Sequence, residues 1–115
     1  PEWLDKTREF LRAHGLSEDN MYPWDEFQPL EPGKFDLISH DLGLMHDRPD
    51  ILEMLLELRT DRGVVIVDDL QNPVYRSEIT ERLSRYDGLE SHSLRWLTLD
   101  KFLRYTMIVL KKSTG

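Results

Sequence analysis

Cysteine is absent from this 115-residue sequence. Its absence excludes disulfide bonds, thiolate catalysis and zinc sites built on cysteine ligands, and we expect a cytoplasmic protein on this ground. Long hydrophobic runs are lacking as well, since no apolar stretch approaches the roughly 20 residues that a membrane-spanning helix needs. The sequence therefore predicts no membrane partner.

Positive charge is also scarce. The chain has 15 Lys and Arg against 22 Asp and Glu, which gives a formal net charge of -7. Because a negative surface repels phosphate groups, this balance speaks against nucleic acids as partners. Hydrophobic residues make up 39% of the sequence, which is enough to build a core, so we expect a single domain over residues 1–115.

Glycine is sparse and scattered. There are six glycines, and no two of them lie within a few residues of each other. Turns that wrap around a nucleotide cofactor need closely spaced glycines, because the backbone must approach the cofactor without interference from Cβ atoms. The sequence therefore lacks a glycine-rich nucleotide-binding turn.

The most informative segment that is present covers residues 63–69, Gly-Val-Val-Ile-Val-Asp-Asp. Four β-branched residues without interruption predict a strand that is buried on both faces of a parallel sheet. Asp68 and Asp69 close this run, at the carboxyl end of the strand, where open α/β sheets bind their ligands. Asp69 is the first candidate for a site residue.

Helix and strand patterns alternate along the rest of the chain. The link over residues 98–104 is too short for a helical crossover, so the last two strands should be antiparallel neighbours. The pattern predicts an α/β fold: a mostly parallel, Rossmann-like sheet with helices on both faces and a C-terminal antiparallel hairpin. The expected elements are helices over 3–14, 47–62 and 72–86, a weak strand over 20–24, and strands over 35–41, 63–69, 89–97 and 105–111.

Two of these segments resemble motifs of the class I S-adenosylmethionine-dependent methyltransferases. Residues 35–41 match the family's F-D-L-I strand that ends in an acidic residue, and residues 58–69 match its L-x-x-G-G-x-x-x-x-D-D pattern. A terminal hairpin that ends over residues 105–112 completes the order, and the resemblance covers nearly the whole chain. It implies an enzyme that transfers a methyl group from S-adenosylmethionine to an unidentified small-molecule or other acceptor.

The family's first strand and its G-x-G-x-G turn have no counterpart here. In the family the sheet order is 3-2-1-4-5-7-6, so the strand over residues 35–41 would lose its neighbour and present a free edge. We therefore expect a partial domain, incomplete relative to the full methyltransferase fold, that binds S-adenosylmethionine poorly by itself. Since free apolar edges invite pairing with another chain, a homodimer through this edge is a second expectation.

Two other functions remain open. The first is a non-catalytic, methyltransferase-like module that acts in assembly through its exposed sheet edge. The second is a flavodoxin-like or receiver-type domain, because a pair of Asp residues after an apolar strand also occurs there. Receiver domains place that pair near the N-terminus and do not end in an antiparallel hairpin, which makes this the weaker alternative.

The resemblance also implies which residues contact the cofactor. Asp25 matches an acidic position that lies near the adenine, and Trp24 beside it either stacks on the adenine or packs in the core. Asp41 matches the acidic end of the strand, where it contacts either the methionine part of the cofactor or solvent. Leu42 lies in the loop where the family places substrate or cofactor contacts.

Further candidates concern the chemical step. His40 and His46 flank the same strand end, and either could serve as a general base toward a hydroxyl acceptor, although loop histidines are often structural. Asp41 and Asp69 end neighbouring strands and could share Mg²⁺ through their carboxylate oxygens. The catechol O-methyltransferase-like branch has an Asn directly after the second Asp, where this chain has Leu70. The alternative for Asp69 is a cap on the following helix.

Overall fold

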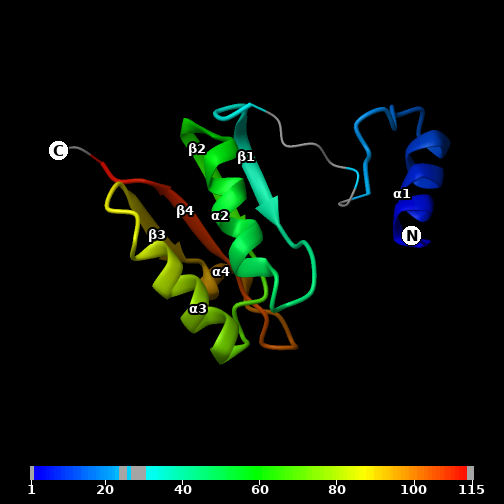
Figure 1. Cartoon of the computed structure of the whole chain (residues 1–115). Helices are drawn as coiled ribbons and strands as arrows, with labels where there is room; N and C mark the ends of the chain where they lie inside the picture. Colours follow the sequence, from blue (N-terminus) through cyan, green and yellow to red (C-terminus); the bar gives the residue numbers. More distant parts are fainter. Residues whose placement is uncertain (1, 24–25, 27–30, 114–115) are drawn as a thin grey trace.

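Four strands form one mixed sheet in the computed structural model, which describes residues 2–23, 26 and 31–113. The order of the strands across the sheet is β1-β2-β4-β3 (Figure 1). The elements along the chain are α1 (Glu2–Ala13), β1 (Phe35–His40), α2 (Arg48–Leu58), β2 (Arg59–Val67), α3 (Pro73–Leu83), β3 (Leu89–Ser93), α4 (Arg95–Thr98) and β4 (Met107–Lys111). None of these helices is both long and apolar enough to cross a membrane.

The α/β fold class and the terminal hairpin are confirmed. Strands β1 and β2 are parallel, with His40 opposite Val67, and β4 is antiparallel to both β2 and β3. The methyltransferase family has the sheet order 3-2-1-4-5-7-6 in its own strand numbering. The order β1-β2-β4-β3 corresponds to the part 4-5-7-6 of that order. Since only β1 and β2 are parallel among the described strands, the sheet is mixed and not mostly parallel.

Several expected elements differ from the structure. The helix expected over 47–62 ends at Leu58, and the strand expected over 63–69 is β2, which begins at Arg59 and ends at Val67. Residues 20–23 form no strand, and Trp24 lies outside the described residues. The strand expected over 89–97 ends at Ser93, and the short helix α4 follows it. The hydroxyl of Ser93 accepts a hydrogen bond from the backbone N–H of Arg95, and the hydroxyl of Thr98 donates to the Leu94 carbonyl, so local side-chain bonds favour the helical turn.

The helix boundaries follow the local sequence. The side chain of Asn72 accepts hydrogen bonds from the backbone N–H groups of Val74 and Tyr75, and Pro73 occupies the first turn of α3, where its missing N–H costs nothing. Asn72 is therefore the cap of α3, a role that we had considered for Asp69. Helix α2 begins at Arg48 without a side-chain cap from Asp47.

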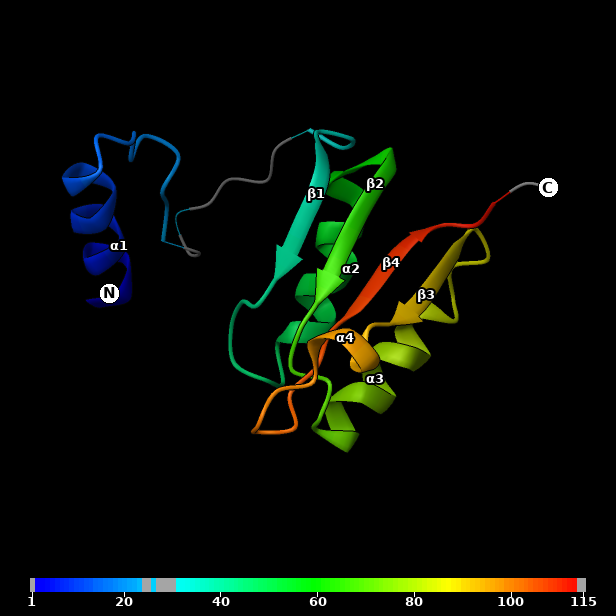
Figure 2. The ribbon, with the colours of Figure 1, turned by 180° about the vertical axis from the view of Figure 1, so that it is seen from behind.

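The core lies between one face of the sheet and the helices α2 and α3 (Figure 1). Seen from behind, most of the opposite face of the sheet is uncovered: the short helix α4 lies at its lower end, and α1 lies apart from it (Figure 2). Val65 and Val67 are fully buried, whereas Val64 and Ile66, which alternate with them, are only partly buried. The expectation that the run over 63–69 is buried on both faces is thus wrong for the described structure, because α2 and α3 cover only one face.

The uncovered face and the edge of β1 expose apolar side chains. Leu37 on β1 is 64% exposed, and Phe35 is 37% exposed. Leu37 lies opposite Val64, and Ile66 lies opposite Ile108 on β4, so the apolar surface continues across three strands. Among the described residues, strand β1 pairs only with β2, so its other edge has no neighbour in this part of the chain.

Candidate functional site

The candidate site lies at the carboxyl ends of β1 and β2. Because the two strands are parallel, the loop over 41–47 and the turn at 68–71 leave the sheet at the same end, and the loop over 99–104 reaches this end too (Figures 1 and 2). Carboxylate oxygens of Asp41, Asp68 and Asp69 lie within 4.8 Å of one another there. The structure therefore brings together Asp41 and Asp69 as the sequence predicts, and adds Asp68.

Arg48 lies between these carboxylates. Its Nη2 is 3.0 Å from Oδ1 of Asp41, and its Nη1 is 3.0 Å from Oδ2 of Asp69. Its Nε donates a further hydrogen bond to the Gly43 carbonyl at 3.2 Å. The Arg48 side chain is only 12% exposed. Burial alone would lower the pKa of Arg48, but the hydrogen bond to Asp69 and the charge of Asp41 outweigh it and raise the pKa above its usual value.

The backbone around the cluster is held in uncommon conformations. Asp69 has φ of 61°, which is unusual for a residue with a side chain, and its N–H donates to the Asp68 carboxylate at 2.8 Å. Gly43 has φ of 78°, and a Cβ at this position would come within 2.9 Å of the Ile51 side chain. The turn at Asp69 and the loop at Gly43 are therefore fixed by local bonds and close packing.

Mg²⁺ does not fit this arrangement as a resident ion. A divalent cation would need the oxygens of Asp41 and Asp69 as ligands, but both carboxylates already bind the guanidinium group of Arg48. The acceptor oxygen of Asp68 is in turn used by the backbone of Asp69. Arg48 contributes one positive charge to the cluster and binds two of its three carboxylates.

The two histidines have very different surroundings. His40 is fully buried, and its Nε2 donates to the Arg48 carbonyl at 3.0 Å, since that carbonyl is an acceptor only. Burial lowers the pKa of His40, so the ring is neutral near pH 7. His46 is 76% exposed, and its Nε2 lies 3.2 Å from the Asp47 carboxylate. Of the two, only His46 is accessible to an acceptor in this structure.

The expected cofactor contacts are divided. Trp24 and Asp25 lie outside the described residues. The Asp41 side chain is 62% exposed, and Leu42 is partly buried against the apolar residues of α2. Of the four residues expected to contact the cofactor, the described part of the chain thus contains Asp41 and Leu42, both in the loop over 41–47, and the sequence has no glycine-rich turn.

Arg48 and Tyr75 are the site residues that sequence analysis missed. Tyr75 is 2% exposed, and its hydroxyl has no hydrogen-bond partner among the described residues although it lies near Arg48. Burial raises the pKa of Tyr75 to about 12, so the group stays neutral. One signal pointed to Arg48: a positive side chain in the first turn of a helix opposes the helix dipole and needs another reason to be there.

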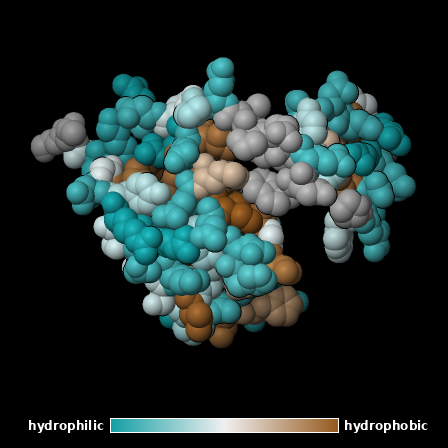
Figure 3. All heavy atoms as spheres, viewed as in Figure 1, coloured by the Kyte–Doolittle hydropathy of each residue, from teal (hydrophilic) through white to brown (hydrophobic). Residues whose placement is uncertain are grey.

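Hydrophobic surface gathers beside the carboxylate cluster. Figure 3 shows it at the lower end of the view, where the beginning of α3 and the loop over 99–104 lie. Val74 is 75% exposed, Phe102 is 62% exposed and Leu103 is 64% exposed. This apolar rim borders the same edge of the sheet as Asp69, since the N–H of Leu70 donates to the Tyr105 carbonyl.

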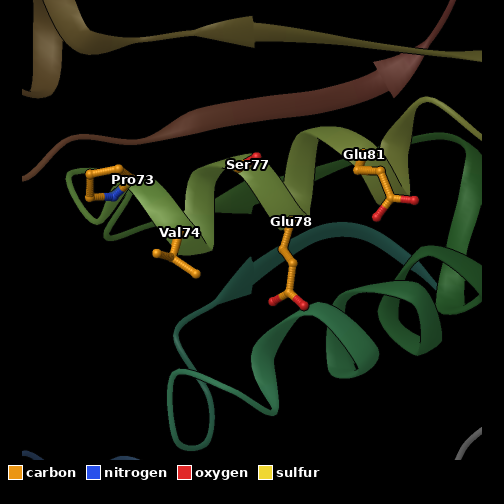
Figure 4. A pocket seen from close by; sticks show the side chains of 5 residues that line it. All are labelled: Pro73, Val74, Ser77, Glu78 and Glu81. Carbon is orange, nitrogen blue, oxygen red and sulfur yellow. The ribbon is translucent and has the colours of Figure 1, made fainter.

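A hollow of about 480 Å³ lies along helix α3 (Figure 4). It is lined by Pro73, Val74, Ser77, Glu78 and Glu81, all from this one helix. Productive sites bring polar groups together from several elements. This hollow does not, so it is not a candidate for catalysis.

Comparisons with protein-family models and with curated proteins found no match for this chain. The solved structures that are similar to it include two named as O-methyltransferases. The O-methyltransferase TomG from Streptomyces achromogenes, involved in tomaymycin synthesis and solved with S-adenosylmethionine, has 18% identity and a TM-score of 0.55 over 70% of this chain and 41% of its own. A candidate O-methyltransferase from Klebsiella pneumoniae has 17% identity and a TM-score of 0.66 over 92% of this chain and 56% of its own.

At these identities the likeness concerns the fold. It agrees with the α/β sheet described above, with its strand order β1-β2-β4-β3. The chain spans about half the length of the two proteins that it resembles. It has a class I methyltransferase-like fold.

Proposed function

We propose that this chain is the C-terminal part of an S-adenosylmethionine-dependent methyltransferase domain that methylates a small-molecule or other acceptor. The observation that carries the proposal is the strand order β1-β2-β4-β3, with a parallel pair followed by an antiparallel hairpin. This is the second half of the family's sheet. The likeness to two proteins named as O-methyltransferases supports the same conclusion.

The free edge of β1 is where the remaining strands would pair. In the complete sheet the family's first strand lies beside the strand that corresponds to β1. The exposed side chains of Phe35 and Leu37, and the partly exposed Val64 and Ile66, would then be covered by the helices that accompany the missing strands. Those strands would also bring the glycine-rich turn to the edge where Asp41 lies.

Within the complete site, this chain would orient the cofactor and take part in proton transfer. S-adenosylmethionine supplies a methyl group whose bond to sulfur breaks as the bond to the acceptor forms. Asp41, which projects into solvent, would contact the methionine part of the cofactor. His46 is exposed in the same loop and would accept the proton of a hydroxyl acceptor. Asp69 would hold Arg48, and through it the loop over 41–47.

Calorimetric titration with S-adenosylmethionine tests this proposal. We expect this chain alone to bind weakly, and a longer polypeptide that supplies the front strands and the glycine-rich turn to bind in the micromolar range. A longer, folded polypeptide that shows no binding would contradict the enzyme function.

A second function rests on the same free edge. We propose as the alternative that the chain is a non-catalytic module that assembles by pairing β1 with β1 of a second copy. Edge strands with exposed apolar residues favour such pairing, and Leu37 is 64% exposed in the centre of β1.

Light scattering over a range of concentrations distinguishes the alternative. A dimer that becomes monomeric when Leu37 is replaced by lysine would support it, because a charge in the edge opposes pairing. Val74→Lys is the matched control, since Val74 is also an exposed apolar residue, at 75% against 64% for Leu37, but lies on α3. A clean monomer at high concentration would contradict assembly through β1.

A further inference from the structure

A cavity of about 440 Å³ opens beside the carboxylate cluster, on the side of the terminal hairpin. Its size lies in the range of small-molecule sites. Its lining comes from four separate segments: the turn after β2, helix α3, helix α4 and the segment that leads into β4. The lining residues are Gln71, Arg76, Arg95, Phe102, Leu103 and Tyr105.

Two guanidinium groups in this cavity lack a carboxylate partner. Among the described residues, neither Arg76 nor Arg95 forms an ion pair, although Arg48, Arg82 and Arg104 each do. Arg76 uses its Nη1 for hydrogen bonds to the Leu70 carbonyl and the Tyr105 hydroxyl, which hold the group in place. Its other nitrogens have no partner in the described part of the chain.

The second guanidinium, that of Arg95, lies over an aromatic ring. Its central carbon is 5.7 Å from the centre of the Tyr105 ring, a cation–π distance. The Arg95 side chain has no hydrogen-bond partner among residues 2–23, 26 and 31–113. Two positive groups thus line one cavity in a protein whose net charge is -7.

The remaining walls are flat and apolar. The centre of the Phe102 ring lies 5.1 Å from Nζ of Lys101 and 5.0 Å from the central guanidinium carbon of Arg104. Asp100 accepts hydrogen bonds from the backbone N–H groups of Phe102 and Arg104 and pairs with the Arg104 side chain, so its charge is already neutralised. These bonds hold the loop that presents Phe102 and Leu103, and Leu103 has φ of 64°.

A buried amide oxygen adds a polar group. Gln71 belongs to the lining of the cavity, and its Oε1, which is buried, has no hydrogen-bond partner among the described residues. An unpartnered buried acceptor is costly, and a ligand hydroxyl would satisfy it once the amide turns toward the cavity. The negative groups nearby are Asp68 and Asp69, whose charges act on Arg104 from the neighbouring cluster. Arg48 binds Asp69 there, and the Asp68 carboxylate accepts the N–H of Asp69.

We propose that this cavity binds a small aromatic carboxylic acid that carries a ring hydroxyl. Arg76 and Arg95 bind the carboxylate, because guanidinium groups match its geometry and charge. Phe102 and Tyr105 contact the ring, and the amide of Gln71 accepts the hydroxyl. The identification of this ligand as the methyl acceptor rests on the proposed function, whereas the binding itself does not.

Calorimetric titration of the whole chain with 4-hydroxybenzoate, in the absence of S-adenosylmethionine, tests the inference. We expect saturable binding, with affinity that falls at least about tenfold for 4-hydroxybenzyl alcohol, which lacks the carboxylate, because charged hydrogen bonds are lost. Cyclohexanecarboxylate should bind less tightly as well, since it lacks the planar ring.

Two variants locate the site. Arg95→Gln should weaken binding of 4-hydroxybenzoate at least about fivefold, because one of the two positive groups is removed. Arg62→Gln is the matched control: Arg62 is exposed and forms no ion pair with the described residues, but it lies on β2, away from the cavity, so affinity should not change. Arg95 makes no side-chain bond within the described chain, so its replacement should leave the fold intact, which circular dichroism checks.

Three results would overturn the inference: no binding to the folded chain at about 10 mM 4-hydroxybenzoate, equal affinity for the uncharged alcohol, or unchanged affinity in Arg95→Gln. Failure of the proposed function is a separate result. It would appear as absence of S-adenosylmethionine binding in the longer polypeptide, while 4-hydroxybenzoate still binds.

Discussion

Replacing Arg48 by glutamine should destabilise this protein more than replacing any arginine of an exposed ion pair. The Arg48 and Asp69 side chains are 12% and 20% exposed, so their pair is largely shielded from water. Removing one partner of a fully buried pair costs about 3–5 kcal/mol, because the other charge is left buried and unpaired. The residual exposure of Asp69 lowers this figure to about 2–3 kcal/mol, since solvent can partly screen the free carboxylate.

The second contact of Arg48 adds little. Asp41 is 62% exposed, and pairs of this kind are worth about 0–1 kcal/mol. The expected loss for Arg48→Gln is therefore about 2–4 kcal/mol of the free energy of unfolding, a large share of the roughly 5–15 kcal/mol of a typical domain. Urea denaturation followed by circular dichroism measures it.

Arg85→Gln is the matched control. Arg85 pairs with Glu81 on α3, and the two side chains are 55% and 61% exposed. Its loss should cost at most about 0.5 kcal/mol. If Arg48→Gln cost less than about 1 kcal/mol, or no more than Arg85→Gln, the view of Arg48 as the residue that holds the cluster together would be refuted.

Three further predictions concern the same end of the sheet. Wild-type protein should show no calorimetric binding of Mn²⁺, whereas Arg48→Gln should bind it through the freed carboxylates of Asp41 and Asp69, and binding by wild type would contradict the metal-free cluster. Burial lowers the pKa of His40 from 6.5, so His40 takes up a proton at a higher pH in the unfolded chain than in the folded one. The free energy of unfolding should therefore fall as the pH drops below about 6.5. His40→Gln should reduce that slope by up to about 1.4 kcal/mol per pH unit, and an unchanged slope would exclude His40 as its cause. Tyr75→Phe should change the free energy of unfolding by less than about 1 kcal/mol or raise it, because the buried hydroxyl makes no hydrogen bond within the described chain, and a loss above about 2 kcal/mol in urea denaturation would show a missing partner.

Much of the fold follows from local patterns. The β-branched run that ends at Val67 lies in β2, as predicted, although this strand begins at Arg59 and not at residue 63, and the Asn72-Pro73 pair gave the correct start of α3. The expectation that Asp41 and Asp69 meet is confirmed, because parallel neighbours end at the same edge of a sheet.

The remaining features depend on contacts that a linear pattern does not contain. Val64 and Ile66 are apolar whether or not a helix covers them, so their sequence cannot reveal that the face is open. The prediction of a strand over 89–97 is wrong from Leu94 onward, because side-chain hydrogen bonds of Ser93 and Thr98 favour a helical turn there. Arg48 pairs with a carboxylate 21 residues away, and such a partner becomes visible only when the chain is folded.

The central claim is that these residues belong to an S-adenosylmethionine-dependent methyltransferase, and calorimetric binding of that cofactor tests it most directly. We expect a polypeptide that adds the missing strands and the glycine-rich turn to bind S-adenosylmethionine at least about tenfold more tightly than this chain. The reason is that a complete site contacts the cofactor from both sides. Asp41→Asn in the longer polypeptide should weaken that binding, with Asp61→Asn, at the opposite end of β2, as the matched control. A longer, folded polypeptide with no affinity for S-adenosylmethionine would contradict the claim.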